Sequence, residues 1–170
     1  MTDGRPPGLT WRYDRSELVA DGIVHVLGAV AAVFAAGALV GLALYTAELP
    51  TVTALTVYAV TLIAVIGCSA LYNMWPVSRT KWILRRFDRL AVLGYLAIAW
   101  SGVVVAHQVF VSLSTAAIVL LVTGGLIYTA GVVFHLWESL RFQNAIWHGF
   151  VLVAAGFQYA AILNGVLLVA

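Results

Sequence analysis

Carboxylate, imidazole, amide and hydroxyl side chains recur at intervals of four residues near the ends of long apolar segments. The interval is shared by Glu17, Asp21 and His25, by Ser69 and Asn73, and by Asn144 and His148. On a helix, residues four positions apart lie on one face, so each set forms a polar stripe. Carboxylates and imidazoles transfer protons or bind metal ions, so stripes on neighbouring helices can build a polar site.

The composition of the chain indicates that these stripes lie in a membrane. Of the 170 residues, 63% are hydrophobic and 9% are charged, and the mean hydropathy is +1.01. A soluble domain carries about a quarter charged residues. The composition therefore excludes a secreted scaffold, a disordered protein and a nucleic-acid-binding protein. Cys68 is the single cysteine, so an internal disulfide is also excluded.

Long uncharged stretches predict an all-α integral membrane protein with five transmembrane helices in an up-down bundle. A bilayer core about 30 Å thick needs about 20 helical residues. The predicted spans are about 19–45, 51–75, 87–106, 113–137 and 143–168. Together they form a single membrane domain over residues 19–170, joined by short loops. Residues 1–18 are predicted to be a cytosolic tail, because they lack the apolar core of a signal peptide.

The positions of the basic residues predict the orientation of this bundle. All nine Lys and Arg residues fall in the tail, in the loop between the second and third spans and its junction with the third, or in the loop between the fourth and fifth. A five-span arrangement places these three segments on one side of the membrane. The positive-inside rule then predicts a cytoplasmic N-terminus and a C-terminus outside.

In this arrangement the polar residues of all five spans gather near the cytoplasmic side. Besides the stripes, they include Asp88 at the start of the third span and His135 at the end of the fourth. Gln158 follows His148 by ten positions and lies deeper. One interpretation is a polar pocket open to the cytoplasm. The other, which composition alone favours, is a structural network worth about 0.6–2 kcal/mol per bond.

Four motifs resemble those of the hemolysin III branch of the progestin and adipoQ receptor family, relatives of the adiponectin receptors. The matching segments are Glu17-x3-Asp21-x3-His25, Ser69-Ala-Leu-Tyr-Asn73, Leu84-Arg-Arg-Phe-Asp88 and Asn144-Ala-Ile-Trp-His148. The glycine-rich run at residues 124–131 resembles the span that precedes the last motif. The resemblance implies a helical protein of the bacterial inner membrane. That family has seven spans, so a five-span chain would be a shortened member.

The resemblance also implies a zinc site, but the residues depart from it. In the family, zinc is held by one histidine of the second span and two of the last, at the positions of Asn73, Asn144 and His148, with Asp88 near its water. A carboxamide oxygen is a poor replacement for an imidazole nitrogen. The zinc site is therefore predicted to be degraded and no cofactor is expected, with zinc as the alternative. A different metal site would need a rearrangement that brings together Asp21, His25, Asp88 and His148.

Three functions follow from these observations. The favoured hypothesis is a non-catalytic lipid-binding, regulatory or accessory membrane protein, whose partners are membrane lipids and a second copy or another membrane protein. The alternative is a metal-dependent hydrolase of lipid amides or esters, in which Asp88 orients the water and Ser69 or His148 stabilises charge. A second alternative is haem bound between His25 and His148 or His135.

Overall fold

The structure, a computed structural model, describes residues 14–75, 113–137 and 139–168. Within these ranges every regular element is helical: α1 (Arg15–Thr46), α2 (Leu49–Met74), α5 (Thr115–Leu136) and α6 (Gln143–Ile162), which continues into the π-helix η1 (Leu163–Leu168). The all-α prediction is confirmed for this part of the chain. The predicted span 87–106, with Asp88, lies outside the described residues.

Four of these helices, counting α6 to Gly165, are long and apolar enough to cross a membrane. Large apolar side chains stay on the outer surface, as shown by Phe34, Leu44 and Tyr45, which are 75%, 66% and 92% exposed. Water would disfavour such a surface, whereas hydrocarbon accepts it. The chain is an integral membrane protein.

The first helix begins earlier than the predicted residue 19, because a capping box fixes its start. The Asp14 carboxylate accepts a bond from the Glu17 amide at 2.8 Å, and the Glu17 carboxylate accepts one from the Asp14 amide at 2.8 Å. These bonds satisfy amides that have no partner inside the helix. The Ser16 hydroxyl and the Glu17 amide lower the pKa of Asp14. The helix N-terminus therefore carries a stable negative charge, which its dipole favours.

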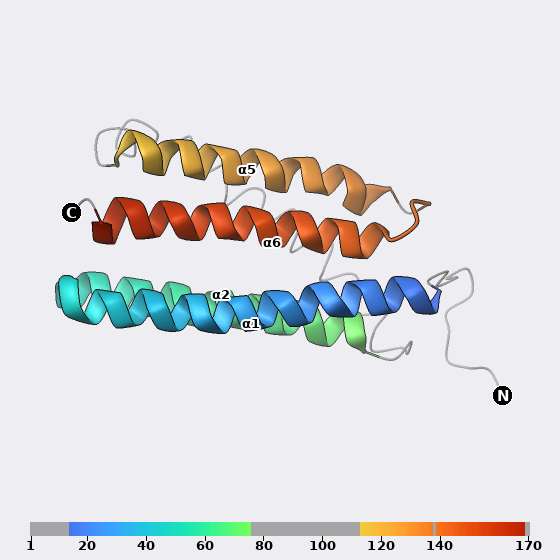
Figure 1. Cartoon of the computed structure of the whole chain (residues 1–170), viewed down its shortest axis with the longest axis horizontal. Helices are drawn as coiled ribbons and strands as arrows, with labels where there is room; N and C mark the ends of the chain where they lie inside the picture. The colour runs from blue at the N-terminus through green and yellow to red at the C-terminus, as the bar shows by residue number, and fades with distance from the viewer. Residues whose placement is uncertain (1–13, 76–112, 138, 169–170) are drawn as a thin grey trace.

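The helices run lengthwise beside one another, with α6 between α5 and the α1–α2 pair (Figure 1). Figure 1 shows α1 and α6 beginning at the end where α2 and α5 finish. We call this the N-terminal end of the bundle. The antiparallel order predicted for neighbouring helices is confirmed for α1 with α2 and for α5 with α6. The last helix finishes at the opposite end, beside the start of α5 (Figure 1).

Close packing between α5 and α6 depends on glycine. A Cβ atom added at Gly131 would lie 2.7 Å from the Cβ of Phe150 and 3.2 Å from the Trp147 ring. One at Gly124 would lie 3.1 Å from the Ala154 carbonyl oxygen. The absence of side chains lets the two backbones approach, as small residues do between helices in lipid.

We expect Gly131→Ala to separate α5 from α6 and to lower stability by about 1–3 kcal/mol, because the contact is made with the root of a side chain. Thermal unfolding in detergent measures the change. Gly125→Ala is the matched control, since its added Cβ would meet nothing within 4 Å. If both variants melt at the same temperature, the α5–α6 contact is wrong.

Candidate functional site

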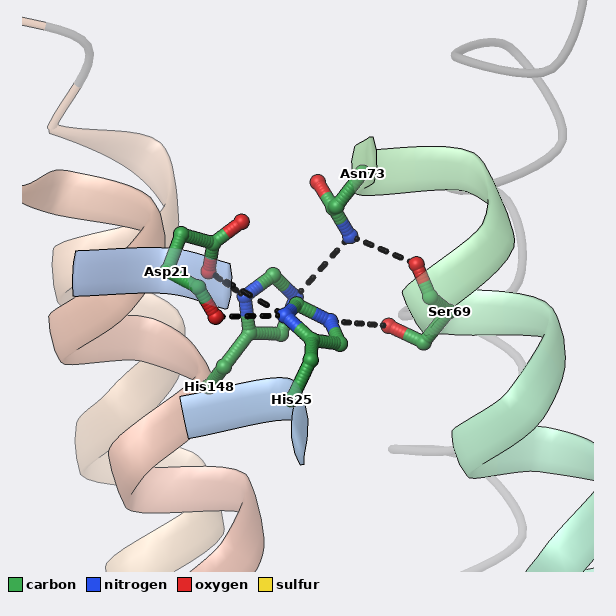
Figure 2. A network of polar contacts seen from close by, with 5 residues as sticks. All are labelled: Asp21, His25, Ser69, Asn73 and His148. Carbon is green, nitrogen blue, oxygen red and sulfur yellow. Dashed lines mark hydrogen bonds and ion pairs between the residues drawn. The ribbon is translucent and has the colours of Figure 1, made fainter. Parts of the chain in front are cut away.

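Five of the predicted polar residues meet between α1, α2 and α6. Figure 2 shows this polar cluster, which consists of Asp21 and His25 from α1, Ser69 and Asn73 from α2, and His148 from α6. Asp21, His25 and Asn73 are buried, with 6%, 5% and 9% exposed surface. The four-residue stripes therefore do face one another, as the spacing predicted.

The Asp21 residue holds both imidazoles through their Nδ1 atoms. Its carboxylate Oδ1 lies 2.6 Å from His148 Nδ1, and its backbone carbonyl oxygen lies 2.8 Å from His25 Nδ1. Carbonyl and carboxylate oxygens only accept, so each Nδ1 carries the hydrogen and donates it. In the neutral imidazoles, both Nε2 atoms therefore carry a lone pair.

These two lone pairs face side chains of α2. The Ser69 hydroxyl lies 3.3 Å from His25 Nε2, and the Asn73 amide nitrogen lies 3.4 Å from His148 Nε2. Ser69 and Asn73 must be the donors, and Asn73 also donates to the Ser69 carbonyl at 3.0 Å. Every ring nitrogen of the cluster therefore has a partner, and the network joins three helices (Figure 2).

Glu17 fixes the start of α6 against α1. Its carboxylate accepts a bond from the Phe142 amide at 2.9 Å, in addition to its role in the capping box. Phe142 has φ 59° and ψ 21°, a left-handed conformation that costs a non-glycine residue about 1–2 kcal/mol. Arg141 adds an exposed ion pair of 3.4 Å to Asp14. The hydrogen bond from the Phe142 amide to Glu17 offsets the conformational free energy of the left-handed Phe142. By fixing where α6 begins, it also places His148 level with Asp21 along the bundle.

A small cavity adjoins the polar cluster at the N-terminal end of the bundle. Its lining includes Glu17, Asp21 and Asn144. The space open to water there is ≈ 10 Å³, about enough for one water molecule. Asn144, which was predicted to face the same site as His148, therefore lies next to the cluster on the side of Glu17.

Two predicted pocket residues lie elsewhere. His135 packs on α5 against the Trp147 ring, with ring centroids 4.9 Å apart. Gln158 lies beside Gly124, whose added Cβ would be 3.3 Å from Gln158 Cγ. Both contact residues of the α5–α6 interface, and their place in a pocket stays a prediction. Asp88 lies outside the described residues.

Gln143 was missed by the sequence analysis. It is 4% exposed and its amide donates to the backbone carbonyl of His135, which links the last turn of α5 to the first of α6. Its position one residue before Asn144, at the start of a predicted span, was the available signal.

Of the three positions at which the resemblance implies zinc, two are asparagines in this chain, Asn73 and Asn144, and the third is His148. Asn73 presents its amide nitrogen to His148, and a protonated carboxamide nitrogen is not a ligand. A different group of possible ligands is present: Asp21, His25 and His148 each offer one atom, and these atoms lie within 4.8 Å of one another. The sequence predicts a different metal site only if a rearrangement brings Asp21, His25, Asp88 and His148 together. Three of these four residues, all except Asp88, lie together in the structure. This group bears directly on the expectation that no cofactor is bound.

Comparison with known proteins supports the predicted resemblance. The chain is 34% identical over 80 residues to a protein named Hemolysin-3 homolog from Bacillus subtilis (strain 168), and 36% identical over 84 residues to Hemolysin-3 from Bacillus cereus. The matches cover 47% and 49% of this chain but only 38% of each relative. No family model and no solved structure matches. The chain is hemolysin III-like over about half its length.

We expect Asp21→Ala to lower the melting temperature in detergent by several degrees. It leaves the Nδ1–H of His148 without its acceptor, and an unsatisfied buried group costs roughly 1–3 kcal/mol. Leu44→Ala, at a side chain 66% exposed on the same helix, is the control and should have little effect. Equal melting temperatures for the two variants would show that Asp21 does not hold α6.

Proposed function

We propose that this hemolysin III-like chain is a five-span membrane protein with its N-terminus in the cytoplasm and a non-catalytic role. In this proposal the polar cluster lies near the cytoplasmic side and serves regulation or the binding of membrane lipids. The observation that carries the non-catalytic role is the contact of Asn73 with His148. It puts a hydrogen-bond donor where a zinc hydrolase of the family would need a ligand.

The arrangement of the described helices supports an odd number of spans. The second helix finishes at the N-terminal end of the bundle, whereas α5 begins at the opposite end (Figure 1). In the proposal, the predicted span 87–106 joins these two ends and brings the number of spans to five. Arg15 begins α1 and Arg141 pairs with Asp14 just before it, so both lie at the N-terminal end, which agrees with the basic side being cytoplasmic.

A lipid-binding role is supported by the outer surface near the polar cluster. Arg141 has a side chain that is 69% exposed, at the end of the bundle where α6 begins. A guanidinium at the end of a membrane-spanning helix can pair with a lipid phosphate, while neighbouring apolar side chains contact the acyl chains. The exposed apolar faces also allow a second copy or another membrane protein to bind.

A metal-dependent lipid hydrolase is the second candidate, favoured by the Asp21, His25 and His148 group. Two imidazoles and a carboxylate are a ligand set of catalytic zinc sites. Against it, the cavity beside the polar cluster has room for about one water molecule and none for a lipid carbonyl group. Haem between His25 and His148 is disfavoured, because their ring centroids are 4.3 Å apart and leave no space for a porphyrin.

Topology reporters fused to the two ends of the chain test the spans. We expect a reporter that works only in the cytoplasm to be active when fused to the N-terminus. A reporter that works only outside should be active when fused after Ala170, because the basic residues stay inside. Adding a third fusion in the Arg141 loop gives an internal control, which should match the N-terminus. Both ends on one side would refute the five-span arrangement.

Hydrolysis assays test the non-catalytic role. Purified protein in lipid nanodiscs, supplied with zinc, should release no fatty acid from lipid amides or esters above the level of a His148→Ala variant. Lipids that copurify with the protein should be intact by mass spectrometry. Zinc-dependent turnover that His148→Ala abolishes would overturn the proposal in favour of the hydrolase.

A further inference from the structure

We propose that Asp21, His25 and His148 bind a divalent transition-metal ion at the junction of α1 and α6. The inference deepens the proposed function and rests on its non-catalytic role, because the ion would regulate helix packing and perform no chemistry. Only His148 is shared with the positions at which the family resemblance implies zinc. The positions implied by the resemblance lie on α2 and α6, whereas the ligands proposed here lie on α1 and α6.

The separations in the group are close to those of a metal site. Ligand atoms on a tetrahedral ion, each about 2.0–2.1 Å from the metal, are about 3.3 Å apart. Asp21 Oδ1 lies 3.5 Å from His25 Nδ1 and 2.6 Å from His148 Nδ1, and one atom from each residue falls within 4.8 Å of the others. Small side-chain rotations therefore suffice to surround an ion, with no movement of the helices.

The surroundings hold the imidazoles as metal sites do. Ligating histidines nearly always donate their other ring N–H to a carboxylate or backbone carbonyl, which fixes the tautomer and the ring. Without the ion, both imidazoles donate Nδ1–H to Asp21. To ligate through Nδ1 beside the Asp21 carboxylate, each ring carries its hydrogen on Nε2, which faces Ser69 or Asn73 of α2. The contacts of the Nε2 atoms with Ser69 and Asn73, at 3.3 and 3.4 Å, are longer than optimal hydrogen bonds. Moving the ring hydrogen from Nδ1 to Nε2 therefore gives up only weak contacts, and the Ser69 hydroxyl can accept the Nε2–H of His25 in place of donating.

The charge and donor types select the class of ion. An ionised Asp21, 6% exposed among apolar helices, is costly without a compensating charge, and a divalent cation supplies one. Two imidazole nitrogens with one carboxylate oxygen suit zinc, cobalt, nickel or iron. Magnesium and calcium prefer oxygen ligands alone and would bind weakly.

Zinc titration of the full-length, tag-free protein tests the site. After treatment with a chelator, the wild type in detergent should bind about one equivalent of zinc and melt at a higher temperature, because the ion binds the folded state. Cobalt at the same site should give the visible absorption of low-symmetry coordination. Asp21→Asn, His25→Gln and His148→Gln should each weaken zinc binding by about 10- to 100-fold, as loss of a group that ligates or orients does.

His135→Gln is the matched control, because it removes a histidine of the described helices that lies outside the group. It should bind zinc as the wild type does. The melting temperature of each variant is first measured without metal. If a variant fails to fold, the test rests on the other two, whose melting temperatures should rise less with zinc than that of the wild type. A wild type that binds no zinc, or variants that bind like His135→Gln, would overturn the inference.

The outcomes separate this inference from the proposed function. Zinc binding without lipid hydrolysis supports both. Hydrolysis that depends on His148 together with zinc binding overturns the non-catalytic role and keeps the site. Failure to bind zinc overturns the site alone, and leaves the non-catalytic proposal standing on its own assay.

Discussion

The hydrogen bond from His148 to the Asp21 carboxylate is the interaction on which the N-terminal end of the bundle depends. At 2.6 Å it joins residues 127 positions apart in the sequence, on α1 and α6. Both side chains are largely buried among apolar helices, where an unpaired polar group is costly, so each stabilises the other. The same Asp21 residue orients His25, which in turn contacts Ser69, so a single carboxylate residue connects three helices.

Lipid imposes this arrangement in a way that water would not. Apolar surface does not drive helices together when the surrounding acyl chains are equally apolar. Association then depends on close backbone approach and on polar bonds, and the structure separates the two. Gly124 and Gly131 bring α5 to α6, whereas the polar cluster brings α6 to α1 and α2. Helix α6 is therefore held by packing on one side and by hydrogen bonds on the other.

The sequence predicted helices and stripes well, because each depends on local spacing. The described helices match four of the predicted spans, and Ser69 with Asn73 forms the expected stripe. Partners between helices were harder, since they depend on how each helix is rotated. His135 and Gln158 were assigned to the pocket by depth alone, but they face the α5–α6 contact. The start of α1 was placed too late, because the charges of Asp14 and Glu17 suggested a tail although their spacing forms a capping box.

The exchange of imidazole for carboxamide changes what the same positions can do. A histidine at Asn73 would offer a lone pair towards His148, as a shared metal requires. The asparagine offers an N–H instead, and this N–H donates a hydrogen bond to the Nε2 lone pair of His148. With that corner occupied by a donor, Asp21, the only buried carboxylate of the described helices, lies beside the Nδ1 atoms of His25 and His148 between α1 and α6. The proposed metal site therefore shares only His148 with the positions at which the resemblance implies zinc, and takes its other two ligands, Asp21 and His25, from α1.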